Sequence, residues 1–205
     1  MRTDEKIRVL EVWRKNPFSN LSRMEIMKSL NKKTKTWIFN TLKHLVKNKI
    51  LNSNRKSNLD IYSLNLSNPI SLKILDFLEI KESINFERLD LISDIINKIP
   101  VKGYCLIVFG SYAENKQKKD SDIDISILIN NKEDEKKIKP YLNDIKLNYK
   151  IKVDDHYILF NEFIEMLTRS EENLGKQIFR KHKIFYNSDI YYNLIKEAYK
   201  NGFRP

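Results

Sequence analysis

Cysteine and histidine are scarce in this sequence of 205 residues, and their scarcity narrows the classes of protein that it can encode. The one cysteine, Cys105, lies within an apolar run, so an intramolecular disulfide is excluded and the side chain is expected to pack as a small core residue. The three histidines are scattered, without the partner spacing of a zinc site or of a nucleophile and its base. Disulfide-rich and zinc-binding classes are therefore not expected.

The sequence also lacks long hydrophobic runs. Its first residues do not contain the apolar segment of a signal peptide, and no run approaches membrane-spanning length. With 41% hydrophobic and 32% charged residues, the composition is that of an ordinary globular protein rather than a disordered chain. We therefore expect a cytoplasmic protein without a membrane partner.

Acidic residues are in short supply in the first third of the chain. Residues 1–66 hold 15 Lys and Arg against 5 Asp and Glu, a net charge of +10, whereas residues 67–205 hold 23 against 22, a net charge of +1. Concentrated positive charge is typical of a module that binds a polyanion. The charge boundary predicts a domain over residues 1–66, a helical connector over 67–100 and a second domain over 101–205.

The first third has the pattern of a winged helix-turn-helix. Apolar spacing predicts helices over 4–15, over 23–30 and from Thr34 onward, and a hairpin whose second strand covers 61–66. In this interpretation the third helix enters the major groove of DNA. The residues expected to bind DNA are Lys32, Lys33, Lys35, Lys43 and Lys47 near this helix, and Arg55 and Lys56 at the hairpin. The alternative is a winged helix that serves dimerisation or partner docking, with its lysines solvated.

Glycine is rare too, and one of the four glycines stands in the pattern that carries the most chemistry. Gly110 and Ser111 follow an apolar run over 104–109, and Asp122 and Asp124 open the next apolar run. Side chains at i and i+2 of a strand point to the same face, so the two carboxylates are expected side by side. A glycine lets the backbone approach a phosphate, and carboxylate oxygens suit Mg²⁺. The pattern predicts nucleotidyl transfer with two Mg²⁺ ions, against the alternative of an acidic loop end without a metal.

The spacing Gly110-Ser111-x10-Asp122-x-Asp124, with Ser121 before the first aspartate, resembles the signature of the DNA polymerase β-like nucleotidyltransferase superfamily. It is similar to that of minimal nucleotidyltransferases, relatives of kanamycin nucleotidyltransferase and of the MNT antitoxins that pair with HEPN toxins. The resemblance covers roughly residues 100–187. It implies an α/β (α+β) fold with a short mixed sheet flanked by helices, ATP or another nucleoside triphosphate as donor, and Mg²⁺ dependence. It also implies that Gly110, Ser111 and Ser121 hold the nucleotide. The C-terminal part resembles that of archaeal winged-helix nucleotidyltransferases.

A third carboxylate on a neighbouring strand usually completes such a site. The next strand predicted, over 149–159, contains Asp154 and Asp155, and only one of them can point into the site because strand faces alternate. The family pattern favours Asp154, so Asp122, Asp124 and Asp154 are the expected catalytic and metal-binding residues. His156 shares the strand face of Asp154 and is either close to the site or separate from it.

These features predict a nucleotidyltransferase that moves AMP from ATP to an acceptor hydroxyl and carries a DNA-binding N-terminal domain. The acceptor is a protein tyrosine, as the MNT resemblance implies, a small molecule or a nucleic acid end. The alternative is a DNA-binding transcriptional regulator whose second domain senses nucleotide without turnover, or an antitoxin-like partner of a HEPN-type toxin. The apolar connector helices also admit a homodimer.

Overall fold

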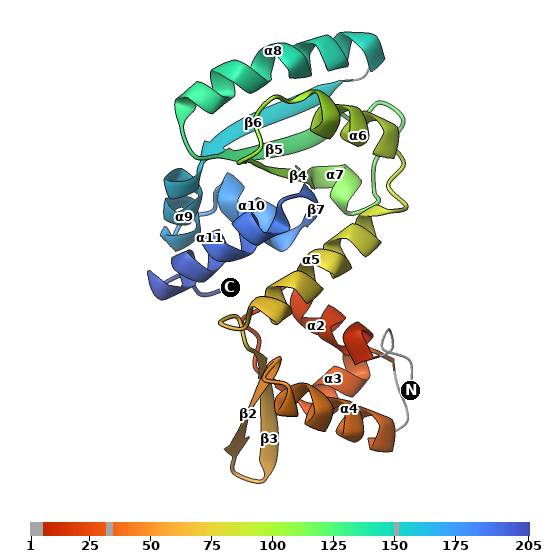
Figure 1. The fold of residues 1–205 in the computed structure, drawn as a ribbon, viewed down its shortest axis with the longest axis vertical. Coiled ribbons are helices and arrows are strands. Elements are labelled where there is room, and N and C mark those ends of the chain that lie inside the picture. The colour runs from red at the N-terminus through yellow and green to blue at the C-terminus, as the bar shows by residue number, and fades with distance from the viewer. Residues whose placement is uncertain (1–5, 32–34, 150–151) are drawn as a thin grey trace. The chain divides into compact units, whose positions relative to one another are not determined.

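The computed structural model describes residues 6–31, 35–149 and 152–205, and the chain divides into two compact units, residues 1–78 and residues 79–204. The described part is a mixture of helices and two small sheets (Figure 1). The α/β class predicted from the sequence is therefore confirmed.

The first unit begins with short helices and ends with a hairpin. The elements in order are η1 (Arg8–Leu10), α2 (Glu11–Arg14), β1 (Leu21–Ser22), α3 (Arg23–Ser29), α4 (Lys35–Lys47), β2 (Leu51–Lys56) and β3 (Leu59–Leu64). The helix predicted over 4–15 is helical throughout residues 6–14, with a 3-10 turn, η1, before the four residues of α2; residues 4 and 5 lie outside the described part of the chain. Trp13 is fully buried and donates its ring N–H to the Ser19 carbonyl, as a core residue with a polar end must.

A short strand that the sequence pattern did not predict joins the hairpin. β1 pairs with β3, and β3 pairs with β2, both antiparallel, so β3 is the central strand of a three-stranded sheet. Two residues are too few to show the alternation of a strand, and a serine directly before a helix is also a typical N-cap residue. Ser22 in fact does both: its side chain accepts from the Glu25 backbone N–H and Glu25 accepts from the Ser22 N–H, a capping box that begins α3.

The second unit is built on a four-stranded mixed sheet. The residues of α5 (Pro69–Ser83) fall on both sides of the boundary between the units. The elements that follow it are α6 (Leu89–Lys98), β4 (Cys105–Phe109), α7 (Gly110–Ala113), β5 (Ile123–Ile129), α8 (Lys132–Tyr149), β6 (Val153–Leu159), α9 (Phe160–Thr168), α10 (Leu174–Arg180), β7 (His182–Tyr186) and α11 (Ser188–Lys200). The strand order is β6-β5-β4-β7. β5 and β6 are parallel and joined through α8, whereas β4 is antiparallel to both β5 and β7.

Helices cover this sheet on both sides. The buried side chains of α6 and α8 pack with Leu106, Val108, Ile125 and Ile127 in one hydrophobic core, while α9, α10 and α11 lie across the opposite face (Figure 1). Because β4 and most of β5 are buried on both faces, their sequences are continuous apolar runs rather than alternating ones. Polar residues at the ends of these strands therefore stand out as residues that the core does not require.

Candidate active site

Two neighbouring strands, β5 and β6, bring carboxylates to the end of the four-stranded sheet at which β4 ends. In the strand register, Phe109 of β4 lies opposite Asp124 of β5, and Asp124 lies opposite Asp154 of β6. Directly opposed residues on neighbouring strands point to the same face, and the strands are about 4.8 Å apart. Asp124 and Asp154 are therefore adjacent carboxylates on one face of the sheet, and Asp122 stands exposed just before β5 begins.

Gly110 forms the backbone turn that lies against the Asp124 carboxylate. Its φ of +66° lies in the left-handed region, which glycine adopts without strain. A Cβ atom at this position would lie 1.9 Å from Oδ2 of Asp124, which no side chain tolerates. The turn after β4 therefore brings bare backbone against the Asp124 carboxylate, and a glycine is needed there for two separate reasons.

The electrostatics of this cluster favour a cation. Burial raises the pKa of Asp124, the neighbouring Asp154 carboxylate raises it further, His156 opposes this and Asp122 adds to it. Each acidic neighbour makes ionised Asp124 less favourable, so a bound divalent cation would relieve the repulsion. Within the ranges that the structure describes, no group of three or more His, Cys, Asp or Glu side chains is already arranged to hold a metal ion. Asp122, Asp124 and Asp154 are therefore not gathered into one cluster of metal ligands in the described structure. Their carboxylate oxygens suit Mg²⁺, and a Mg²⁺ ion here would take its remaining oxygen ligands from water and substrate phosphates, as it commonly does.

His156 contacts Asp154 directly. Its Nε2 lies 3.2 Å from Oδ2 of Asp154, and its ring lies 5.6 Å, centroid to centroid, from the ring of Phe109. The Asp154 side chain is 59% exposed, so this contact is what orients it. His156 therefore lies close to the acidic cluster and not separate from it. The sequence pattern did not predict that Phe109 lies beside the acidic cluster. Its position as the last residue of the apolar run before Gly110 would have indicated this.

Asp155 lies on the other face of β6. It forms an ion pair with Lys146 of α8, and its side chain is only 12% exposed. It also raises the pKa of Tyr157, after burial, which is the larger cause. The alternation of strand faces thus separates two consecutive aspartates, one beside Asp124 and one against the helix layer.

The loop between α7 and β5 is fastened by its own contacts. Ser121 accepts a hydrogen bond from the Lys118 N–H at 2.8 Å, which closes a turn just before Asp122. At the other end, Lys183 of β7 is 5% exposed and donates to Oδ1 of Asn115 at 2.8 Å. Ser121 therefore has a structural role in the turn, whatever it contributes to a nucleotide, and Lys183 supports the loop from a position that no sequence motif marked.

The residues predicted to bind DNA lie in the other unit. Lys35, Lys43 and Lys47 are exposed on α4, and Arg55 and Lys56 are exposed at the end of β2. All residues from 52 to 60 are exposed, so the hairpin tip projects from its unit. Lys32 and Lys33 lie outside the described residues.

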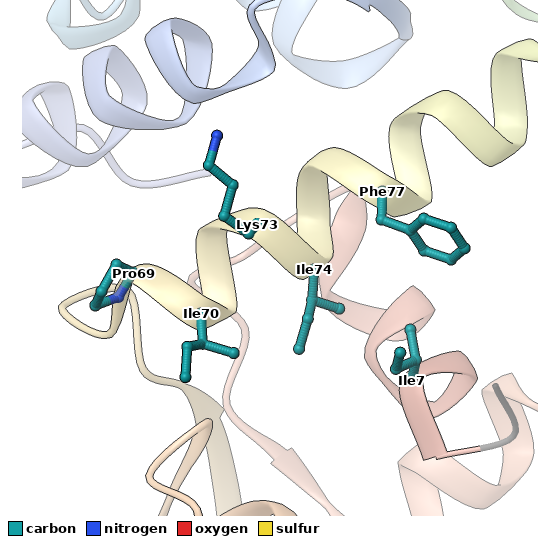
Figure 2. Close-up of a pocket in the computed structure, with 6 residues that line it drawn as sticks. All are labelled: Ile7, Pro69, Ile70, Lys73, Ile74 and Phe77. Atoms are coloured by element: carbon teal, nitrogen blue, oxygen red, sulfur yellow. The ribbon is translucent and has the colours of Figure 1, made fainter. Parts of the chain in front are cut away.

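The first unit also contains an apolar pocket of about 300 Å³ that is distinct from the acidic cluster (Figure 2). Its lining residues are Ile7, Pro69, Ile70, Lys73, Ile74 and Phe77. The lining offers hydrophobic side chains and one lysine, without the carboxylates or nucleophiles that catalysis requires. The chemistry of this chain is therefore sought at the end of the second sheet.

A mixed sheet with helices on both faces and an acidic strand end defines an α/β fold consistent with a nucleotidyltransferase. Residues 92–191 match the family model described as "Polymerase beta, Nucleotidyltransferase". The matched segment contains Gly110, Asp122, Asp124 and Asp154, and the match supports a polymerase β-like nucleotidyltransferase domain over these residues.

Two further comparisons complete this result. A chain from "Crystal structure of the toxin-antitoxin with AMP-PNP" is similar at 17% sequence identity, over 55% of this chain and 86% of that chain, with a TM-score of 0.38. So low a TM-score supports no conclusion about fold or partner. Curated proteins gave no match. No helix in the described ranges is both long and apolar enough to cross a membrane.

Proposed function

We propose that this protein is a Mg²⁺-dependent nucleotidyltransferase that transfers a nucleoside monophosphate, AMP from ATP, to an acceptor hydroxyl. The observation that carries the proposal is the register of Asp124 and Asp154 on neighbouring strands, with Gly110 against the Asp124 carboxylate. The family match over residues 92–191 supports the same class of reaction. A cytoplasmic location belongs to this proposal as well.

Each residue of the site has a distinct role in this reaction. Asp122, Asp124 and Asp154 hold Mg²⁺, which when bound neutralises the triphosphate and stabilises charge on the attacking and leaving oxygens. The backbone after Gly110, with Ser111 and Ser121, positions the phosphates. Asp154, whose side chain is 59% exposed, accepts the proton of the acceptor hydroxyl as the hydroxyl oxygen bonds to the α-phosphorus and pyrophosphate leaves. The bond from the α-phosphorus to the bridging oxygen of pyrophosphate breaks as the bond to the acceptor oxygen forms, so no redox partner is needed.

The direct test is transfer of label from α-labelled ATP. Candidate acceptors are the protein itself, tyrosine-containing proteins, small hydroxyl compounds and nucleic acid ends, each with and without Mg²⁺. Wild-type protein is expected to transfer label to at least one acceptor class, and Asp124→Asn to transfer none. Nucleotide binding without transfer to any class would instead favour a sensor.

A second function is favoured by the exposed basic residues of the first unit. Lys35, Lys43 and Lys47 on α4, with Arg55 at the hairpin, suit binding of the DNA backbone by a winged helix-turn-helix. This function is compatible with catalysis and also with a regulator that senses nucleotide. Duplex binding whose affinity falls steeply with salt is the expected result, and affinity that ignores salt would remove the proposal.

Two further candidate partners have different sources: the HEPN-type toxin follows from the family resemblance, and the homodimer from the apolar connector helices. A HEPN-type toxin partner and a homodimer both predict a complex larger than one chain. Co-purification from the native cell and light scattering of the purified protein distinguish them.

A further inference from the structure

The solvent face of α4 carries two residues that the fold does not explain. Phe39 is a large aromatic side chain that remains 43% exposed, and Asn40 beside it is exposed at the middle of the helix. An exposed aromatic ring gains little from burial, and asparagine is a poor helix former. Neither residue belongs to the buried face of α4.

Asn40 lies on a continuous line of exposed residues along α4, and Phe39 lies at the edge of this line. Thr36, Asn40, Lys43 and Lys47 are spaced by four, three and four residues and are all exposed, so they follow one face of α4, with Phe39 at its edge. The opposite face is the buried one, formed by Ile38, Thr41, Leu42 and Leu45. The exposed line therefore changes along the helix from neutral residues near its beginning to lysines near its end.

Phe39 is held in place by its neighbour. The guanidinium of Arg23, the first residue of α3, lies 5.8 Å from the centroid of the Phe39 ring, within the range of a cation–π contact. This contact fixes the ring at the surface and places a cationic group beside it. A fixed aromatic edge next to a cation is suited to the floor of a DNA groove, where base edges and phosphates lie close together.

The chemistry of these side chains matches one kind of base pair. Asparagine forms paired hydrogen bonds with N6 and N7 of adenine, and an apolar side chain such as phenylalanine or the threonine methyl packs on the thymine methyl group. Recognition helices place residues from their beginning against base edges, which here are Thr36, Phe39 and Asn40. Lys43 and Lys47, further along, then face phosphates.

We infer that α4 reads A·T base pairs in the major groove, with Asn40 on an adenine and Phe39 on a neighbouring thymine methyl. The inference rests on the DNA binding proposed above and adds a base preference and the residues that set it. Lysines alone would bind every sequence alike, whereas this pair of side chains distinguishes A·T from G·C.

The experiment selects binders from a library of duplex DNA with a randomised central segment, using the full-length protein. Wild-type protein is expected to enrich A·T pairs at adjacent positions. Asn40→Ala is expected to lose the adenine preference, roughly 5- to 150-fold in relative affinity, and Phe39→Ala to lose the neighbouring thymine preference. Lys56→Ala is the matched control, because it should weaken binding to all sequences and leave the enriched pattern unchanged.

The outcomes separate the inference from the function on which it rests. Absence of duplex binding at low salt would overturn both. Binding without enrichment, or an enriched pattern that Asn40→Ala and Phe39→Ala leave intact, would overturn the inference and leave DNA binding standing. Thermal unfolding of each variant is the folding control; both side chains are exposed, and alanine suits a helix better than asparagine, so neither variant is expected to unfold.

Discussion

At Gly110, one substitution is expected to change both the stability of the backbone turn and the catalytic activity. Replacing it with alanine should cost about 1–3 kcal/mol of unfolding free energy, because a non-glycine residue is strained at positive φ. The added Cβ also displaces the Asp124 carboxylate, so transfer activity should be lost. Gly103→Ala is the control: a Cβ there meets nothing within 4 Å, and both unfolding free energy and activity should be unchanged. A fully active Gly110→Ala variant would show that Asp124 is not held as the structure indicates.

Asp154 and Asp155 offer a matched pair of substitutions one residue apart. Asp154→Asn should abolish transfer with little change in stability, since the side chain is largely exposed. Asp155→Asn should retain transfer but lose about 1–3 kcal/mol, because it breaks the ion pair with Lys146 on the helix side of β6. Urea unfolding and label transfer measure the two effects. The reverse pattern would reassign the third carboxylate to Asp155.

The raised pKa of Asp124 makes a prediction for stability against pH. An acid whose pKa is higher in the folded than in the unfolded state binds more protons when folded, so stability falls as pH rises from the unfolded value, about 3.9, through the folded value. Asp124→Asn should therefore raise the melting temperature at neutral pH and change it little below the unfolded pKa. Mg²⁺ should stabilise the wild type at neutral pH but not this variant. A neutral-pH melting temperature lowered by Asp124→Asn would contradict the repulsion within the cluster.

Sequence reasoning at this scale succeeded where the chemistry was local. The apolar runs before Gly110 and after Asp124 indicated β4 and β5. The shared face of Asp122 and Asp124 stays a prediction from strand geometry, because β5 begins at Ile123 and Asp122 lies just before it. The contacts of Asp155 with Lys146 and of Lys183 with Asn115 join residues that lie on different elements, or far apart in the sequence. No periodicity in the sequence predicts such contacts.

At the scale of elements, α3 illustrates how a local motif fixes a boundary. The Ser22 and Glu25 capping box satisfies backbone N–H groups at the start of the helix, and hydrogen bonds from Ser22 lower the pKa of Glu25. Ser22→Ala should destabilise the protein by about 1 kcal/mol. Ser29→Ala, an exposed change at the end of the same helix, should have a much smaller effect, and urea unfolding compares the two. Equal effects would mean that the cap contributes nothing.

The elements that were predicted correctly are those with long apolar patterns. β4 and β5 lie where the apolar runs placed them, and α3 lies where the helix over 23–30 was predicted, to within a few residues at each end. The pattern gave no sign of β1, because a two-residue strand is fixed by tertiary pairing rather than by its own sequence. In the first helix it did not distinguish the 3-10 turn at Arg8–Leu10 from α-helix.

At the scale of the whole molecule, the division of charge between the first third and the rest predicts two activities that can be removed separately. Lys43→Ala with Lys47→Ala should weaken duplex binding and reduce the slope of log affinity against log salt by about 1.8, since each phosphate contact contributes about 0.9. The same double variant should leave label transfer to a protein or small-molecule acceptor unchanged, because both lysines lie in the first unit and the acidic cluster in the second.

The reciprocal change completes the test. Asp124→Asn should abolish transfer while leaving duplex affinity and its salt slope as in the wild type, since α4 and the hairpin are untouched. Filter binding across a salt series and label transfer from α-labelled ATP give both readouts on the same preparations. A loss of transfer in the double-lysine variant that parallels its loss of DNA affinity would contradict the separation. Such a loss would mean that the basic surface of the first unit also takes part in binding the acceptor.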